Sequence, residues 1–429
     1  MIKFLTELYK LNTVYTIIGI ANTALLLFYV GVSQSTDIWF ASLIIVTSFA
    51  KLFMTGFMNE IFLPKLVRCW PKNSHYAEHL LSNIFTVMGV ISVVGVLIIF
   101  ISSTTIVDVI YPSIAVDIRE EIAVMMRWSS PVLLLIIINE LLSMTLNSRE
   151  IYAQPERARI FSSFLNFVII LSLYSKINIW ALYASMMISQ MANLVFLVYA
   201  VVKNNIKIGI QFRKKTWRAA KIQSKFSVSV FYILSTQAYL LLFRSYLSSF
   251  PPGMLTVIHY VETIIIKGRS LIMRPISTVT LTDFAKDSQH RSGSGVWLRL
   301  LGYFITLSLC FFITGMIVRY YGIYVLLLVL DTQEYYQLIW FRSLLAFYIL
   351  MIPFEIILVV IRKKLVSRGY FNKFYLFSGL TQIICIALVL FVMNYSINSL
   401  NMIYAIVLFD VISKILVGAF YFFTKDFVD

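Results

Sequence analysis

Long apolar segments recur along the sequence from residue 11 to residue 423 and leave little room for anything else. A helix needs about 20 apolar residues to cross the hydrocarbon core of a bilayer. Lipid offers the backbone no hydrogen-bonding partner, so such segments cross it as helices. The sequence therefore predicts an all-α polytopic membrane protein with about twelve transmembrane helices: 11–33, 37–64, 80–102, 122–146, 157–175, 178–202, 226–249, 254–282, 296–318, 335–361, 372–394 and 398–423.

The composition agrees with this class. Hydrophobic residues make up 60% of the chain and charged residues 13%, whereas about 25% of a soluble domain is charged. The net charge of +16 comes from lysines and arginines that gather in alternate loops. This placement is typical of the cytoplasmic loops of membrane proteins and needs no nucleic-acid partner. We therefore expect both termini on the cytoplasmic side.

The chain divides into two halves of six helices each. Residues 1–202 form an N-terminal six-helix bundle and residues 226–429 a C-terminal one, joined by a cytoplasmic linker, 203–225, with eight Lys or Arg and no acid. The linker is either a surface for anionic lipid headgroups or a plain topological anchor. The segments WFAS and HYVE begin similar charged helices about 220 residues apart, which predicts two parallel pseudo-repeats around a central cavity.

Several ionisable residues fall inside the predicted helices. Charge within a bilayer is costly, so it usually faces a partner or a water-filled cavity. The candidates for a substrate cavity are Asp37, Lys51, Glu60, Arg127, Glu140, His259, Glu262, Lys267 and Arg269. Asp410 and Lys414 stand four residues apart on one helix and are expected to form a structural pair. Arg244 lies near a predicted helix end and is expected to extend to the membrane surface.

No motif for catalysis or for a cofactor accompanies these charges. The sequence contains no GxxxxGK[ST] phosphate loop, and no His, Cys or carboxylate cluster has the spacing of a metal site. We expect no catalytic residue, no metal and no cofactor, and hence a protein that is not an enzyme. Coupling to an ion gradient or to the membrane potential remains open.

The segment from Asp37 to Pro64 resembles the second transmembrane helix of the MurJ (MviN) flippases, in the multidrug/oligosaccharidyl-lipid/polysaccharide (MOP) exporter superfamily. The matching positions are Asp37, Trp39, Phe40, Lys51, Gly56, Phe62 and Pro64. A second match places His259, Tyr260 and Glu262 where the family has an aromatic pair and then an acid. The two matches together cover about 70 residues.

The resemblance implies a flippase of the bacterial cytoplasmic (inner) membrane that serves cell-envelope polysaccharide biosynthesis. Its substrate would be a polyprenyl-diphosphate-linked oligosaccharide, and its partners membrane lipids and polysaccharide assembly proteins. Lys51 and Arg269 would present positive charge from both halves to one diphosphate. Two arginines of the lipid II flippases are replaced here, by Asn22 and Thr263, and the family's fourteen helices compare with twelve here. These departures favour an O-antigen, capsule or exopolysaccharide repeat unit over lipid II.

Two other functions compete with this one. A drug/cation antiporter of the same superfamily typically has an acid in the first helix, whereas residues 11–33 contain none. A membrane-embedded glycosyltransferase or polymerase usually has a large outer loop, whereas no outer loop here exceeds about 20 residues. The flippase is the function that the sequence favours.

Overall fold

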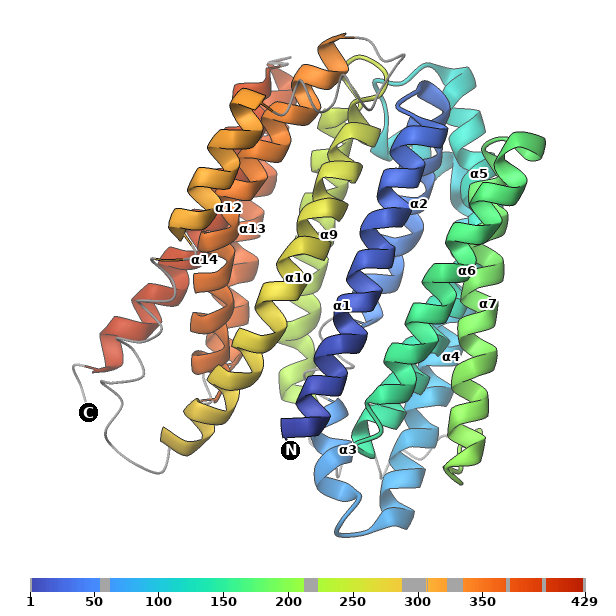
Figure 1. The fold of residues 1–429 in the computed structure, drawn as a ribbon, viewed down its shortest axis with the longest axis vertical. Helices are drawn as coiled ribbons and strands as arrows, with labels where there is room; N and C mark the ends of the chain where they lie inside the picture. The colour runs from blue at the N-terminus through green and yellow to red at the C-terminus, as the bar shows by residue number, and fades with distance from the viewer. Residues whose placement is uncertain are drawn as a thin grey trace.

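The computed structural model describes residues 2–54, 62–211, 223–287, 306, 308–321, 335–367, 371–395 and 399–426. Within these ranges every regular element is a helix, and the long helices run alongside one another (Figure 1). The predicted all-α class is confirmed. Glu60 and the linker residues 212–222 lie outside the described residues.

Ten of the twelve predicted segments coincide with helices, and the segment 37–64 includes α2 up to Met54, the start of α3 and residues 55–61, which lie outside the described ranges. The first half contains α1 (Ile2–Leu25), which a short π-helix extends (Leu26–Val30), α2 (Gln34–Met54), α3 (Leu63–Cys69), α4 (Ser74–Ile110), α5 (Val116–Ser148), α6 (Ala153–Ile177) and α7 (Trp180–Lys203). The second half contains α9 (Gln223–Leu247), α10 (Met254–Asp287), α12 (Tyr335–Ser367), α13 (Phe371–Asn394) and α14 (Leu400–Asp426). Helical residues 308–321 belong to the predicted segment 296–318, most of which lies outside the described ranges.

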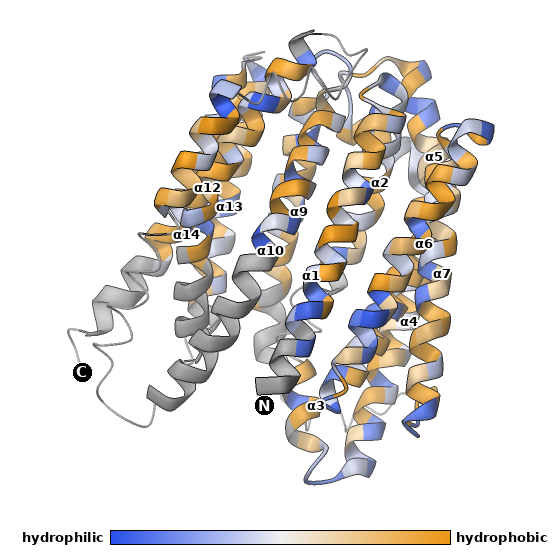
Figure 2. Ribbon diagram, viewed as in Figure 1, coloured by the Kyte–Doolittle hydropathy of each residue, from blue (hydrophilic) through white to orange (hydrophobic). Residues whose placement is uncertain are grey.

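The outer surface of the bundle is apolar. In the described part of the chain, nine helices are long and apolar enough to cross a membrane. Their exposed residues include Ile101, which is 73% exposed, and Val195, which is 70% exposed. Figure 2 shows hydrophobic residues along most of α4 and α7, and hydrophilic residues on the lower parts of α1 and α6. Exposed apolar residues of this extent face lipid in a membrane protein.

Helices α1 to α7 pack mainly on one another, and so do α9 to α14. The two groups meet where α1 contacts α10 and where α2 contacts α9 and α10. At one end of this junction Ser113, which precedes α5, lies beside Ser248, which follows α9, with 3.1 Å between their hydroxyl oxygens. The junction is therefore built chiefly from α1, α2, α9 and α10.

The helix α4 is longer than a bilayer requires. Its 37 residues span about 55 Å, against about 30 Å for the hydrocarbon core. Residues 206–211 run along its first turns: the Gly209 N–H donates to Ser82 Oγ and the Gln211 N–H to Thr86 Oγ1, both at 3.0 Å. The start of the predicted linker is thereby attached to α4.

A proline lies inside α5 and another inside α12, at the repeat spacing of about 220 residues. Proline has no N–H and therefore leaves the carbonyl four residues earlier without its helical partner. For Pro131 that carbonyl belongs to Arg127, and Ser130 Oγ donates to it at 2.8 Å. The two halves thus interrupt corresponding helices at corresponding positions.

Candidate functional site

Asp37 of α2 binds the first turn of α10. Its carboxylate accepts hydrogen bonds from the Gly253 N–H at 2.6 Å, from the Thr256 N–H at 2.8 Å and from Thr256 Oγ1 at 2.6 Å. The first N–H groups of a helix lack partners within the helix and carry partial positive charge, so a carboxylate stabilises them. We call this contact, formed by Asp37, Gly253 and Thr256, the Asp37 cap. It joins the two halves of the chain.

Gly253 permits the cap through its backbone conformation. Its φ of +97° is one that residues with a side chain rarely adopt. A Cβ atom there would lie 2.7 Å from Gln337 Nε2 and 2.7 Å from Val32 Cγ1. Glycine is therefore required both by the conformation and by the space.

Further along α2 and α10 from the Asp37 cap, aromatic residues are followed by charged residues. His259 stacks on Phe40 with ring centroids 4.0 Å apart, and Tyr260 meets the same ring edge-on at 5.4 Å. Next to this stack lie Lys51, Arg244 and Glu262, which we name with His259 the central cluster. Lys51 interacts electrostatically with Glu262 and Arg244, and His259 with Arg244 and Lys51. Three helices, α2, α9 and α10, contribute to it.

Arg244 forms an ion pair inside the protein. It is 4% exposed, and its Nη2 donates to Glu262 Oε2. The hydroxyl of Tyr348 on α12 donates to the other oxygen of Glu262 at 3.4 Å. The prediction that Arg244 extends to the membrane surface is therefore wrong, because the Glu262 carboxylate of the neighbouring helix holds it inside the protein.

Lys267 and Arg269 contact different helices. The ammonium of Lys267 lies 4.0 Å from the centre of the Tyr15 ring on α1, a cation–π contact. Arg269 Nη1 donates to Glu355 of α12. The helix rise places Lys51 and Arg269 about 20 Å beyond the Asp37 cap, so they lie at comparable depth.

Arg127 and Glu140, both on α5, bind residues of the first half. Arg127 Nε donates to Ser103 of α4 at 2.6 Å. Glu140 binds Arg159 of α6 at 3.3 Å, and Arg159 also binds Glu156 at 3.3 Å. Eight of the nine predicted cavity residues are thus divided among the Asp37 cap, the central cluster, contacts of α10 with α1 and α12, and helices of the first half. Glu60 is not described.

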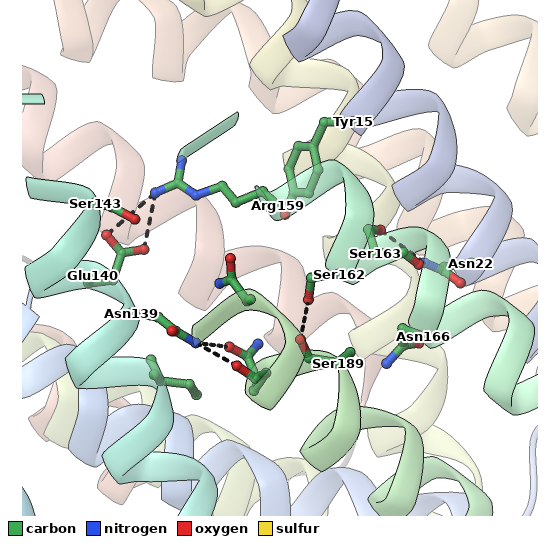
Figure 3. Close-up of a pocket in the computed structure, with 13 residues that line it drawn as sticks. Tyr15, Asn22, Asn139, Glu140, Ser143, Arg159, Ser162, Ser163, Asn166 and Ser189 are labelled. Carbon is green, nitrogen blue, oxygen red and sulfur yellow. Dashed lines mark hydrogen bonds and ion pairs between the residues drawn. The ribbon is translucent and has the colours of Figure 1, made fainter. Parts of the chain in front are cut away.

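Glu140 and Arg159 border a cavity of about 330 Å³ between α1, α5, α6 and α7 (Figure 3). Amides and hydroxyls line most of it, among them Asn22, Asn139, Ser162 and Ser189. Asn139 Nδ2 donates to Gln190, and Ser162 Oγ donates to the Ser189 carbonyl. Among the described residues, the side-chain oxygens of Asn22, Asn139 and Asn193 have no hydrogen-bond partner. This cavity can accept hydrogen bonds from a small polar group.

Asp410 and Lys414 lie together in the second half. Lys414 Nζ is 2.8 Å from Asp410 Oδ1, and Gln382 of α13 donates to the same carboxylate. Among the described residues, no group of three or more His, Cys, Asp or Glu is placed to hold a metal ion.

The predicted cavity set left out Arg244, Glu355 and Arg159, which bind Glu262, Arg269 and Glu140. One signal was present: a carboxylate buried in an apolar helix is tolerated only when a cation is near. The presence of Glu262 therefore predicts a basic residue on a neighbouring helix, and Arg244 of the preceding helix fits that prediction.

The model of the family described as lipid II flippase MurJ matches residues 27–425. Among solved structures, a lipid II flippase MurJ in an inward closed conformation is 15% identical, with a TM-score of 0.74 over 98% of this chain and 87% of that chain. An inward-facing MATE family multidrug resistance transporter of the MOP superfamily is 12% identical, with a TM-score of 0.66 over 96% and 92%. A MOP superfamily transporter from Pyrococcus furiosus is 11% identical, with a TM-score of 0.61 over 96% and 93%. No curated protein sequence matches the chain. At these identities the structural likeness shows the fold alone.

Proposed function

Because the chain belongs to the MurJ lipid II flippase family, we propose that it moves a polyprenyl-diphosphate-linked oligosaccharide across the cytoplasmic membrane by alternating access. Members of this family are transporters in the inner membrane. The lipid tail of such a substrate stays in the bilayer, while its diphosphate and saccharide need a polar passage. The protein supplies that passage between its two halves.

The central cluster carries this proposal. Lys51 and Arg244 place two cations at the junction, from α2 of one half and α9 of the other, and both interact with the carboxylate of Glu262. A cation at membrane depth is costly unless an anion pairs with it. A diphosphate is such an anion, and arginine suits its oxygens in particular. Arg269 lies at a comparable depth and is proposed to take part.

We propose an O-antigen, capsule or exopolysaccharide repeat unit as the substrate, with lipid II as the alternative. Two arginines of the lipid II flippases are replaced by Asn22 and Thr263. Asn22 Nδ2 donates to the backbone oxygen of Ser163 at 2.9 Å and to its hydroxyl at 3.1 Å, so this side chain is engaged by α6. Both replacements leave fewer cations for the headgroup than lipid II meets in its own flippases.

The proposed movement is a rocking of residues 1–202 against residues 226–429, with 203–225 as the linker. Transporters built from two repeats commonly move in this way about a site near the midplane. The proposal places both termini and the linker in the cytoplasm, and Asp37 at the outer end.

Lys51→Ala should abolish most of the transport while leaving the amount of folded protein near normal. Lys51 is exposed, so its replacement creates no packing defect. The measurement uses proteoliposomes that contain a fluorescent short-chain polyprenyl-diphosphate saccharide, with chemical quenching of the label in the outer leaflet. Lys207→Ala removes another exposed lysine, outside the junction, and serves as the control. If the Lys51 variant flips lipid as fast as the wild type, the anion site lies elsewhere. If the wild-type protein exports cationic dyes and flips no lipid, the protein is an antiporter.

The topology makes a second testable statement. A reporter active only outside the cytoplasm should be active after Asn394, and one active only in the cytoplasm should be active after Asn205, because lysines and arginines gather on the cytoplasmic side. Activity with the two reporters exchanged contradicts the orientation.

A further inference from the structure

Among the described residues, only one of the two terminal nitrogens of the Arg244 guanidinium forms a hydrogen bond. Its side chain is 5% exposed, and Nη2 donates to Glu262. Nη1 is buried and has no hydrogen-bond partner among the described residues. A guanidinium is a planar fork that binds two oxygens of one carboxylate or phosphate through parallel bonds. Arg244 therefore retains the capacity for a second oxygen at a place where an unused donor is unfavourable.

Glu262 is the more loosely held member of the pair. It is 23% exposed, against 5% for Arg244, and among the described residues its second oxygen receives one long hydrogen bond, of 3.4 Å, from Tyr348. Lys51 interacts electrostatically with the same carboxylate. If Glu262 left Arg244, it would still have a cation and a hydroxyl beside it. The pair can therefore separate without stranding the carboxylate.

We propose that Glu262 occupies the place of a phosphate group at Arg244, and that a lipid-linked diphosphate binds this guanidinium by displacing the carboxylate. This inference rests on the proposed function and adds a binding residue, Arg244, and a competing internal anion to it. A diphosphate carries more charge than a carboxylate and offers oxygens to both Nη1 and Nη2. Since Arg244 belongs to α9 and Glu262 to α10, the exchange replaces a contact between two helices by a contact with the ligand.

The test is a double-mutant cycle that measures binding of farnesyl diphosphate to the purified full chain in nanodiscs of zwitterionic lipid. Glu262→Gln should bind the probe about tenfold more tightly than the wild type, because the internal competitor is gone. Arg244→Gln should bind it about tenfold more weakly or worse. In the Arg244→Gln background, Glu262→Gln should bring no gain. This last result separates competition at Arg244 from a general effect of removing a negative charge.

Asp108→Asn is the matched control. Asp108, which is 56% exposed, binds Arg119 at 2.8 Å where α4 ends and α5 begins, so this variant also removes a carboxylate from an arginine, but outside the central cluster. It should leave probe affinity unchanged. Arg244→Gln leaves Glu262 without its partner and can fail to fold; the double variant removes both charges and keeps the comparison possible. The double variant should bind farnesyl diphosphate as weakly as Arg244→Gln does. If Arg244→Gln does not fold, the double variant is compared with Glu262→Gln and should bind the probe about tenfold more weakly.

Three results would overturn the inference: Glu262→Gln binds no more tightly, its gain persists without Arg244, or neither it nor the wild type binds farnesyl diphosphate. Phosphatidylglycerol nanodiscs that abolish probe binding would instead assign Arg244 to ordinary phospholipid headgroups and overturn the diphosphate assignment. The flipping assay is read separately. Flipping that persists while the cycle fails refutes only the exchange, whereas absent flipping refutes the proposed function and leaves the binding site standing.

Discussion

A disulfide between positions 113 and 248 should stop transport, and a reductant should restore it. Ser113 and Ser248 join the ends of the two halves at what we propose is the outer side, with their hydroxyl oxygens 3.1 Å apart. Neighbouring side chains this close suit the geometry of a disulfide after Ser113→Cys and Ser248→Cys. A bond there holds the outer side closed, and a protein that works by alternating access cannot then release its substrate outward.

The measurement compares lipid flipping in proteoliposomes before and after oxidation, and again after reduction. The background carries Cys69→Ser and Cys310→Ser, whereas Cys385 is buried and can stay. Each single cysteine variant, oxidised in the same way, should keep its activity. Full flipping by protein that is completely cross-linked would show that the halves do not separate at this end.

Asp37→Ala should shift the protein strongly away from its outer-closed state. The Asp37 carboxylate accepts three hydrogen bonds from Gly253 and Thr256, and a bond to a charged group contributes about 1.5–3 kcal/mol. Allowing for partial exposure, we expect a loss of about 3 kcal/mol, or about a hundredfold change in the ratio of closed to open protein. Ser248→Cys should then react much faster with a membrane-impermeant thiol reagent, and transport should fall.

Asp117→Ala provides the comparison. Asp117 also lies in the first turn of a helix, α5, but it is exposed and caps no other helix across the junction. Its loss should leave the labelling rate unchanged. Gly253→Ala should reproduce the effect of Asp37→Ala, because the added Cβ conflicts with φ +97° and with Gln337. If Ser248→Cys is labelled at the same rate with and without Asp37→Ala, the Asp37 cap has no part in gating.

Hydropathy was sufficient for the fold class and for the order of the helices, because crossing lipid imposes a length and an apolar character on each helix. It was a poor guide to helix ends. The segment 80–102 belongs to α4, which extends from Ser74 to Ile110. The extra turns carry polar residues, since they extend beyond the apolar core, and apolar runs cannot reveal them.

The sequence singled out candidate residues but not the pairs that they form. His259 and Glu262 stood out because they are ionisable residues in an apolar segment. Their partners depend on which helices are neighbours: Glu262 binds Arg244, 18 residues away, whereas Arg269 binds Glu355, 86 residues away. Glu140 looked equivalent to Glu262 in the sequence, yet α5 turns it towards Arg159 of α6. Only the packing of the helices separates these two carboxylates.

Pro131 and Pro353 give each half a point of low bending stiffness in the middle of a long helix. In α5 the freed carbonyl of Arg127 is already satisfied by Ser130, so opening an angle there breaks no backbone hydrogen bond of the helical ladder. In the proposed orientation, the portions of α5 and α12 that follow these prolines lie on the cytoplasmic side, and they can swing while the portions that precede the prolines stay still. The inner side can then widen to admit a saccharide with the outer side fully shut, so that no continuous leak for ions opens across the membrane.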